Sequence, residues 1–247
     1  MGDTKDGGKE PNGESRTANV VRRLEALIFD GDLQPGQLLP SEGELAAEMG
    51  VSRLTVREGV RTLEARGLLE VRRGRRPAVA HPNAAPLSGF FAASLRRDPR
   101  NLLELIEVRL ALEVHAATLA ARHATRTALT SLELAFDTMR QATDEESFNQ
   151  ADVRFHAMLA AASGNQMISF LIEAMDEPMH ESRLRSLRGH LARGRSMADL
   201  MDEHARILTA VRERDARSAA EAMREHLVQT RMDLRAFLAL PAAAGRR

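Results

Sequence analysis

Two short helices separated by a glycine turn limit the fold of this chain more than any other feature of its sequence. Ser41 and Glu44 form the S-x-x-E capping box that opens a helix, which we expect over residues 42–48. A glycine ends that helix, and Ser52 is the N-cap of a second one over residues 53–66. Two short helices joined by so tight a turn predict a helix-turn-helix.

The flanking sequence predicts the winged form of this motif. An amphipathic helix over residues 19–29 precedes the pair, and apolar residues on both sides of the basic turn RRGRRP at 72–77 follow it. Beyond residue 87 the periodicity is helical throughout. The predicted fold class is therefore mainly α: an N-terminal winged helix-turn-helix and a C-terminal all-α antiparallel bundle of six or seven helices.

Composition and the positions of glycine and proline divide the chain into five segments. The first is polar and rich in glycine, and the sequence HPNAAP at 81–86 is typical of a linker. In the bundle, one long helix is expected over residues 165–187. The predicted segments are a disordered tail at 1–15, a winged helix-turn-helix DNA-binding domain at 16–80, a linker at 81–87, an all-helical effector- and metal-binding domain at 88–240 and a tail at 241–247.

The composition excludes several classes of protein. The chain has no cysteine, which removes disulfides and thiolate metal sites and fits a reducing cytoplasm. No apolar run reaches the length of a membrane span, and the N-terminus lacks the apolar core of a signal peptide. We therefore expect a cytoplasmic protein with no membrane partner. The formal net charge is zero, so any binding of nucleic acid must come from a local patch.

Such a patch follows the second helix of the motif. Arg53 and Arg57 are four residues apart and share a helix face, from which an arginine can hold guanine by two hydrogen bonds. Thr55 lies between them, within reach of a phosphate or a thymine methyl group. Residues 53–76 hold eight arginines and three glutamates. A solvated helix face is the alternative, but the basic wing favours binding to double-stranded DNA.

At these residues the sequence resembles a known family. LPSExELA at 39–46, GVSRxTVRE at 50–58 and LxxxGL at 63–68 closely resemble the winged helix of GntR regulators over residues 18–80. The resemblance implies DNA contacts by the start of the second helix and by the wing. We expect these contacts from Ser52, Arg53, Thr55, Arg57, Gly74, Arg75 and Arg76.

The sequence departs from the family pattern at two places. Gly43 stands where the family usually carries a DNA-contacting arginine. The wing reads Gly74-Arg75-Arg76 instead of Gly-x-Gly, so Arg75 and Arg76 are expected to contact the minor groove or phosphates. Gly43 also weakens its helix by up to about 1 kcal/mol relative to alanine.

Four side chains of the bundle have the spacing of a metal site. Asp152 and His156 lie four residues apart on one helix face. His204 and His226 lie eleven residues before and after Asp215, where two antiparallel helices meet. At that count both are about 16 Å from the turn and at one level. An Asp-His-His-His site is predicted, with ordinary surface pairs and a coincidence of spacing as the alternatives.

Residues 101–240 resemble the FCD-type ligand-binding domain of the FadR subfamily of GntR regulators. The matching stretches are LIEVRxxxE at 105–113, DxxFH at 152–156, ASxN at 162–165, EHxxI at 203–207 and AxxAMxxHL at 219–227. The resemblance implies a divalent transition metal on Asp152, His156, His204 and His226, with zinc favoured over nickel or manganese. Members that bind fatty acyl-CoA generally lack this set, which disfavours that effector class.

Arg109 and Asn165 are the candidate effector-binding residues. Arg109 lies on an apolar helix stripe with Leu102 and Leu105, where an unpaired charge would be costly. It either forms a structural ion pair, for example with Glu113, or binds an effector carboxylate by its two-pronged guanidinium, as the resemblance implies. Asn165 is either a pocket residue or a helix cap.

These features together predict a transcription regulator, acting as a repressor. We expect a homodimer that binds a palindromic operator and responds to a small organic acid held at the metal. One alternative is a regulator that senses the metal ion itself, and another is a bundle whose metal is purely structural or that binds no metal. A metal-dependent hydrolytic enzyme is the third, but no further general base has a suitable spacing, so we predict that the chain is not an enzyme.

Overall fold

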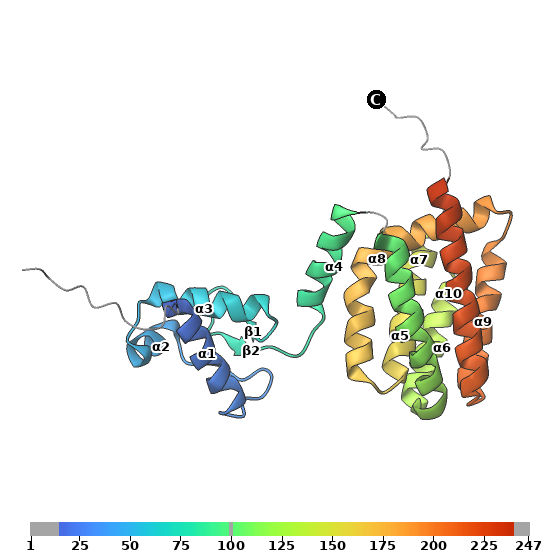
Figure 1. Cartoon of the computed structure of the whole chain (residues 1–247). Helices are drawn as coiled ribbons and strands as arrows, with labels where there is room; N and C mark the ends of the chain where they lie inside the picture. The colour runs from blue at the N-terminus through green and yellow to red at the C-terminus, as the bar shows by residue number, and fades with distance from the viewer. Residues whose placement is uncertain (1–14, 99–100, 240–247) are drawn as a thin grey trace, which may run out of the picture. The chain divides into compact units, whose positions relative to one another are not determined.

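The protein divides into two compact units, one ending at Pro86 and the other beginning at Leu87. The structure is a computed structural model and describes residues 15–98 and 101–239 (Figure 1). The predicted tails at 1–15 and 241–247 lie outside the described residues, except for Ser15. The hydroxyl of Ser15 accepts a hydrogen bond from the Ala18 amide, so the first helix begins three residues earlier than the periodicity indicates.

The first unit is a winged helix-turn-helix. Leu69 of the first wing strand is paired with Val79 of the second in antiparallel register. Its elements are α1 (Arg16–Phe29), α2 (Glu42–Met49), α3 (Arg53–Ala65), β1 (Leu69–Glu70) and β2 (Ala78–Val79).

Local capping explains where α2 and α3 begin. The Ser41 hydroxyl accepts from the Glu44 amide while the Glu44 carboxylate accepts from the Ser41 amide. The Ser52 hydroxyl accepts from the Thr55 amide in the same way at the start of α3. The core between the helices is apolar and contains Val20, Leu24, Leu45, Val56, Val60 and Leu63.

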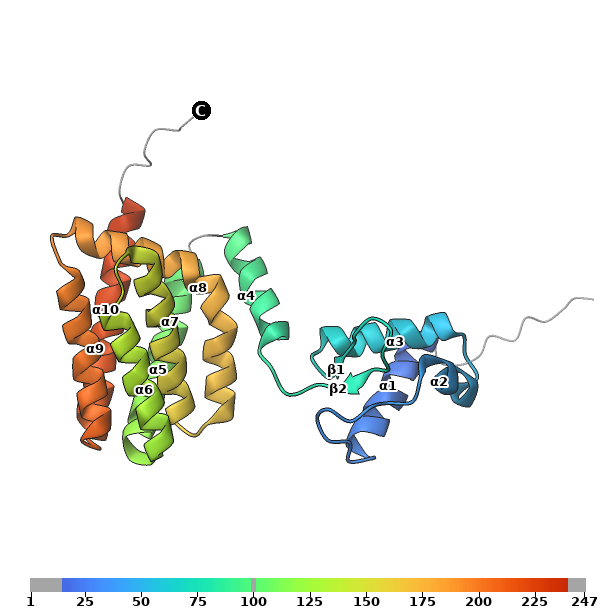
Figure 2. The ribbon, with the colours of Figure 1, turned by 180° about the vertical axis from the view of Figure 1, so that it is seen from behind.

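The second unit is entirely helical in its described residues, which confirms the predicted fold class. α10 packs along α5 and α8, so helices distant in sequence lie side by side (Figures 1 and 2). The consecutive helices α6 and α7 also pack along each other. Its helices are α4 (Ala85–Arg97), α5 (Asn101–His123), α6 (Arg126–Arg140), α7 (Glu145–Ala162), α8 (Gln166–Ala192), α9 (Met197–Arg212) and α10 (Ala216–Ala239).

Buried charged residues interrupt the apolar interior of this bundle. Along α5, Ile106 belongs to one apolar cluster and Ala117 to another. Arg109 and Glu113 lie between them in sequence, and both are almost fully buried. Buried charges need partners, so this level of the bundle is where a functional site is expected.

α8 is longer than predicted and changes direction along its length. It continues to Ala192, beyond the expected end at residue 187, and it contains Pro178. A proline inside a helix removes one hydrogen bond and bends the axis, as both views show (Figures 1 and 2). After the bend, α8 approaches α10 so closely that a Cβ on Gly189 would overlap the Asp233 carbonyl oxygen.

No helix within residues 15–98 and 101–239 combines the length and the apolar character that a membrane crossing requires.

Candidate metal centre and DNA-reading surface

Three helices bring the four predicted ligands to one point. Asp152 and His156 come from α7, His204 from α9 and His226 from α10. One potential ligand atom from each side chain lies within 4.8 Å of all the others, and the three imidazoles are buried. The spacing on α7 and around Asp215 predicted that these four side chains lie close together, and the structure places them so.

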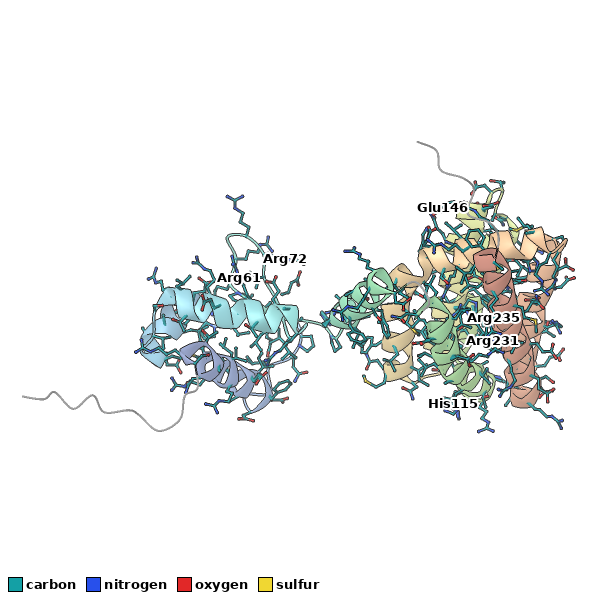
Figure 3. All side chains as sticks on the ribbon, turned by 45° about the horizontal axis from the view of Figure 1, so that its top comes forward. Arg61, Arg72, His115, Glu146, Arg231 and Arg235 are labelled. Atoms are coloured by element: carbon teal, nitrogen blue, oxygen red, sulfur yellow. The ribbon has the colours of Figure 1, made fainter. Side chains whose placement is uncertain are left out.

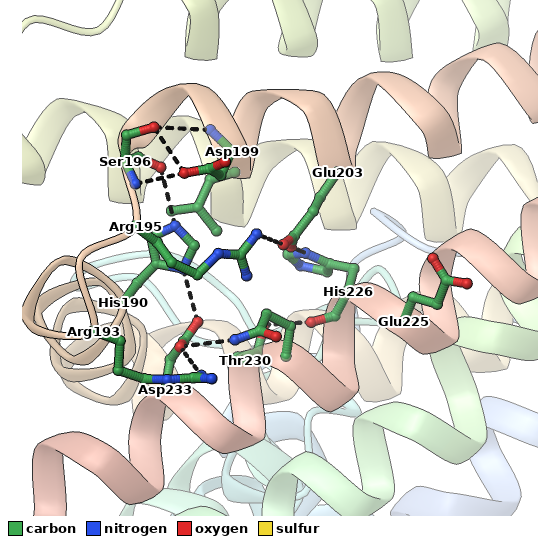
Figure 4. A network of polar contacts seen from close by, with 12 residues as sticks. His190, Arg193, Arg195, Ser196, Asp199, Glu203, Glu225, His226, Thr230 and Asp233 are labelled. Carbon is green, nitrogen blue, oxygen red and sulfur yellow. Dashed lines mark hydrogen bonds and ion pairs between the residues drawn. The ribbon is translucent and has the colours of Figure 1, made fainter.

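Each imidazole is held from outside the cluster through its Nδ1 atom. Nδ1 of His156 is paired with the Glu113 carboxylate, and Nδ1 of His204 lies 2.8 Å from the Leu200 carbonyl oxygen. Nδ1 of His226 lies 2.8 Å from Glu203 Oε2 (Figure 4). This leaves Nε2 of every ring for the centre, and such outer partners typically orient histidine ligands of metals.

Two ring nitrogens that face the centre of the cluster lack hydrogen bonds within the described part of the chain. Nδ1 of His204 donates to the Leu200 carbonyl, so Nε2 is the ring atom that faces the cluster. That atom lies 2.9 Å from Asp152 Oδ1. Nε2 of His204 and Nε2 of His156 are both buried without a hydrogen bond. A divalent metal would suit these donors, because zinc is bound by histidine nitrogen and aspartate oxygen atoms.

The ionisation states favour the same assignment. Burial, and then the charge of His204, lower the pKa of His226 to about 4, so its ring is neutral at physiological pH. Burial opposes ionisation of Asp152, but the neighbouring imidazoles and Arg183 hold its pKa well below the usual value. Burial also opposes the charge on His156, but Glu113 and Asp152 raise its pKa. The carboxylates at this centre therefore attract positive charge, which a metal ion supplies.

Arg109 forms the ion pair that was one of its two predicted roles. The residue is 1% exposed, and its Nε and Nη2 atoms face the two carboxylate oxygens of Glu113. Because Glu113 in turn holds His156, Arg109 positions this candidate ligand through one intermediate residue. Arg109 also lines a small cavity beside the centre.

That cavity is the candidate effector pocket. Its volume is about 40 Å³, and the candidate ligands Asp152 and His226 form part of its wall. Arg183 lies in the same wall, with Nη1 donating to Asp152 Oδ2 at 3.1 Å and Nη2 to Asp176 Oδ1 at 3.4 Å. Burial raises the pKa of Asp176 to about 6.

Sequence reasoning missed Arg183. It lies in no motif of the chain, and it is buried where α8 packs against α7 and α10. The one available signal is that Asp176 and Arg183 are seven residues apart and share a helix face.

Asn165 does not join the pocket. Its Oδ1 atom accepts hydrogen bonds from the amides of Met167 and Ile168 at the start of α8. The prediction of an effector contact is therefore corrected to the alternative role, helix capping, because the side-chain acceptor is already used.

The predicted DNA-reading arginines lie at the exposed start of α3. Arg57 is held by Glu42 of α2, with Nη2 and Nε at 2.9 and 3.1 Å from Oε2. The Arg53 guanidinium lies over Gly43, where a Cβ would be 3.2–3.4 Å from its atoms. The small residue at 43 thus leaves the space that Arg53 uses.

The other predicted DNA contacts differ in their surroundings. The hydroxyls of Ser52 and Thr55 are 2.8 Å apart and bind each other. Gly74 has a φ of +73°, which suits a glycine at the wing turn, and Arg75 beside it is exposed. Arg76 differs from the expectation, because its Nε donates to the Leu39 carbonyl at 2.8 Å and ties the base of the wing to the preceding loop.

A groove between α3 and the wing carries further positive charge. Its lining includes Arg57 together with residues that the sequence did not single out. Figure 3 shows Arg61 of α3 and Arg72 of the wing on the same side of this unit. The arginines in the groove are Arg57, Arg61, Arg72, Arg73 and Arg75.

Two family models match the chain, one on each unit. Residues 16–79 match the model described as bacterial regulatory proteins, gntR family. Residues 104–229 match the FCD domain.

Relatives extend the similarity to most of the chain. The Glc operon transcriptional activator of Escherichia coli K12 is 32% identical, with 87% of each chain covered. The regulator LutR of Bacillus subtilis 168 is 33% identical over 81% of this chain and 93% of its own. A solved structure of Streptococcus agalactiae GntR is 32% identical, covers 87% of this chain and 98% of that one, and has a TM-score of 0.67.

The relatives are transcription regulators, which confirms the prediction that the chain is not an enzyme. The two family matches together cover both units, and the identity to the Glc operon activator extends over 87% of the chain. The chain belongs to the GntR family, as a DNA-binding transcription regulator with an FCD domain.

Proposed function

We propose that this regulator is a cytoplasmic homodimer that represses transcription from a palindromic operator and is released by a small carboxylate. Arg53 and Arg57 enter the major groove, helped by Ser52 and Thr55. The wing, with Gly74, Arg75 and the free end of Arg76, contacts the minor groove and phosphates. Two copies related by a two-fold axis match the symmetry of such an operator.

The proposed response to an effector rests on the buried Asp-His-His-His cluster and the residues that hold its imidazoles. Four nitrogen and oxygen donors without thiolates suit zinc, and nickel or manganese is the alternative with the same donors. The bound metal would supply a positive charge and an open position beside the cavity. The protein's own residues Glu113, Leu200 and Glu203 hold the imidazoles in orientation.

An effector acts as a switch only if it binds one arrangement of the dimer better than the other. The cavity is lined by residues of α5, α7, α8, α9 and α10, so a ligand there contacts helices from across the bundle. We propose that this changes the relative placement of the two DNA-binding units.

Elemental analysis of protein purified without a histidine tag tests the metal. We expect about one divalent ion per chain and its loss in His226→Gln. His115→Gln, an exposed histidine of α5, is the matched control and should retain the ion. Retention of metal by His226→Gln would contradict the proposed centre.

Measuring operator binding with and without metal distinguishes a regulator that responds to a carboxylate from one that senses the metal ion itself. If short carboxylates weaken binding only in the metal-loaded protein, the proposed effector role is supported. If chelation alone changes operator affinity and no acid has any effect, the protein senses the metal itself.

The DNA-reading surface is tested by the double variant Arg53→Ala, Arg57→Ala. Each bidentate contact to guanine contributes about 1–3 kcal/mol, so specific affinity should fall at least about 30-fold. Arg66→Ala, at the other end of α3, removes one positive charge and should have a much smaller effect than either single variant, Arg53→Ala or Arg57→Ala. Unchanged specific affinity in the double variant would refute this assignment.

A further inference from the structure

We propose that Leu54 selects a thymine in the operator by burying its side chain against the C5-methyl group of that base. This inference rests on the proposed entry of α3 into the major groove. It adds one apolar, base-specific contact to the arginine contacts proposed above.

Leu54 is an apolar side chain of α3 that the core leaves outside. It is 63% exposed, and it belongs neither to the apolar core of the first unit nor to the partly buried residues packed against that core. Single exposed leucines are common on protein surfaces, so exposure alone carries no argument. The position of this leucine does, because it is the second residue of α3 and recognition helices present their N-terminal residues to base edges.

The other side chains of the first turn of α3 have less to offer a base. The Ser52 hydroxyl accepts from the Thr55 amide and lies 2.8 Å from the Thr55 hydroxyl, so the two hydroxyls are occupied with each other. Thr55 is also half-buried, whereas Arg53 and Leu54 are exposed. Arg53 and Leu54 are therefore the outward-facing side chains of this turn that can approach a base.

Leu54 continues the arginine-rich face of α3. It lies three residues before Arg57 and seven before Arg61, so the three side chains share a helix face. Arg57 and Arg61 line the groove between α3 and the wing, where Figure 3 labels Arg61. An approach of these arginines to a duplex would carry Leu54 into the major groove with them.

The chemistry of the major groove limits what a leucine can recognise. The base edges expose hydrogen-bond donors and acceptors there, and thymine adds an apolar group, its C5-methyl. A leucine has neither a donor nor an acceptor, so against a polar edge it would displace water without replacing the hydrogen bonds of that water. Against the methyl group both partners gain by leaving water. Leu54 therefore favours thymine over the other three bases.

Deoxyuridine tests the inference, because it lacks only the methyl group of thymine and keeps the same base pairing. Full-length wild type first selects a duplex from a pool of randomised sequences, and each thymine of that duplex is then replaced in turn. We expect one thymine in each half-site whose replacement weakens wild-type binding about fourfold, the contribution of one buried methyl group. Leu54→Ala should bind the original and the substituted duplex equally well at that thymine.

Two further variants separate the methyl contact from general effects. Leu134→Ala removes a leucine of α6 with a similar exposure of 61%, and it should respond to deoxyuridine like wild type. Leu54→Gln keeps the length of the side chain but not its apolar character, and it should lose the response. The affinity of Leu54→Ala for a duplex of arbitrary sequence should equal that of wild type, because the substitution removes no charge.

The outcomes distinguish this contact from the proposed function. If no deoxyuridine substitution weakens wild-type binding, or if Leu54→Ala keeps the wild-type response at every thymine, the inference is overturned and the proposed contacts of Arg53 and Arg57 stand. If wild type selects no sequence from the pool, the proposed entry of α3 into the major groove is itself refuted.

Discussion

The absence of a side chain at Gly43 has two opposite effects in the DNA-binding unit. It weakens α2, because glycine costs up to about 1 kcal/mol relative to alanine inside a helix. It also leaves room for the guanidinium of Arg53, which lies directly over it. The residue therefore connects the stability of one helix with the orientation of a predicted base contact in the next.

Gly43→Ala should accordingly raise stability and alter DNA binding together. We expect the free energy of unfolding to rise by up to about 1 kcal/mol. The new Cβ would lie 3.2–3.4 Å from the Arg53 guanidinium, which must shift by a few tenths of an ångström, so specific operator affinity should change. Gly89→Ala in α4, where nothing lies within 4 Å, is the control for helix propensity alone. Equal operator affinity of wild type and Gly43→Ala would contradict the role of this contact.

A second residue-scale prediction concerns His226 in metal-free protein. Its pKa is about 4 when folded, against 6.5 as the ordinary value, so between these pH values only the unfolded chain binds the proton. The stability that depends on the neutral ring is complete above about pH 6.5 and is lost as the pH falls toward 4. Denaturation with chelator present should show wild type losing more stability than His226→Gln over this interval. Parallel pH profiles would count against a neutral buried ring.

At the scale of elements, the close contact of α8 with α10 holds one wall of the cavity. Gly189 permits it, because any larger residue would overlap the Asp233 carbonyl. Gly189→Ala should therefore destabilise the bundle by about 1–3 kcal/mol, as overpacked interiors typically are. Chemical denaturation measures this loss, and Gly89→Ala again serves as the control. A variant as stable as wild type would mean that the two helices can separate without cost.

How much of each element could be predicted depends on whether its determinants are local. The starts of α2 and α3 follow from Ser41 and Ser52, and the level of His204 and His226 follows from counting along two helices. Local signals and helical periodicity were sufficient there.

Arg183 illustrates what those signals do not contain. Its burial depends on the packing of α8 against α7 and α10. The position of Arg76 is similar, because its partner Leu39 is distant in sequence. Contacts of this kind arise from tertiary packing and leave no periodic trace in the sequence.

At the scale of the whole molecule, the two units should respond differently to removal of the metal. All four ligands belong to the second unit, so binding of an ion stabilises that unit alone by mass action. Calorimetry with a strong chelator should lower the transition temperature of the bundle and leave that of the winged unit unchanged. Readdition of zinc should restore it. A chelator that moves neither transition would argue against a resident metal.

His204 and His226 are equally far from Asp215 in sequence, so the function of the α9–α10 hairpin depends on the number of residues in each arm. One residue added on either helical arm would turn its imidazole about 100° around the axis and move it about 1.5 Å along it. Residues added at the connection itself, between Arg212 and Ala216, would leave both arms in register. Length changes are therefore tolerable only at the tip of the hairpin. A series of single insertions along both arms, each scored by metal content, would locate the proposed metal site.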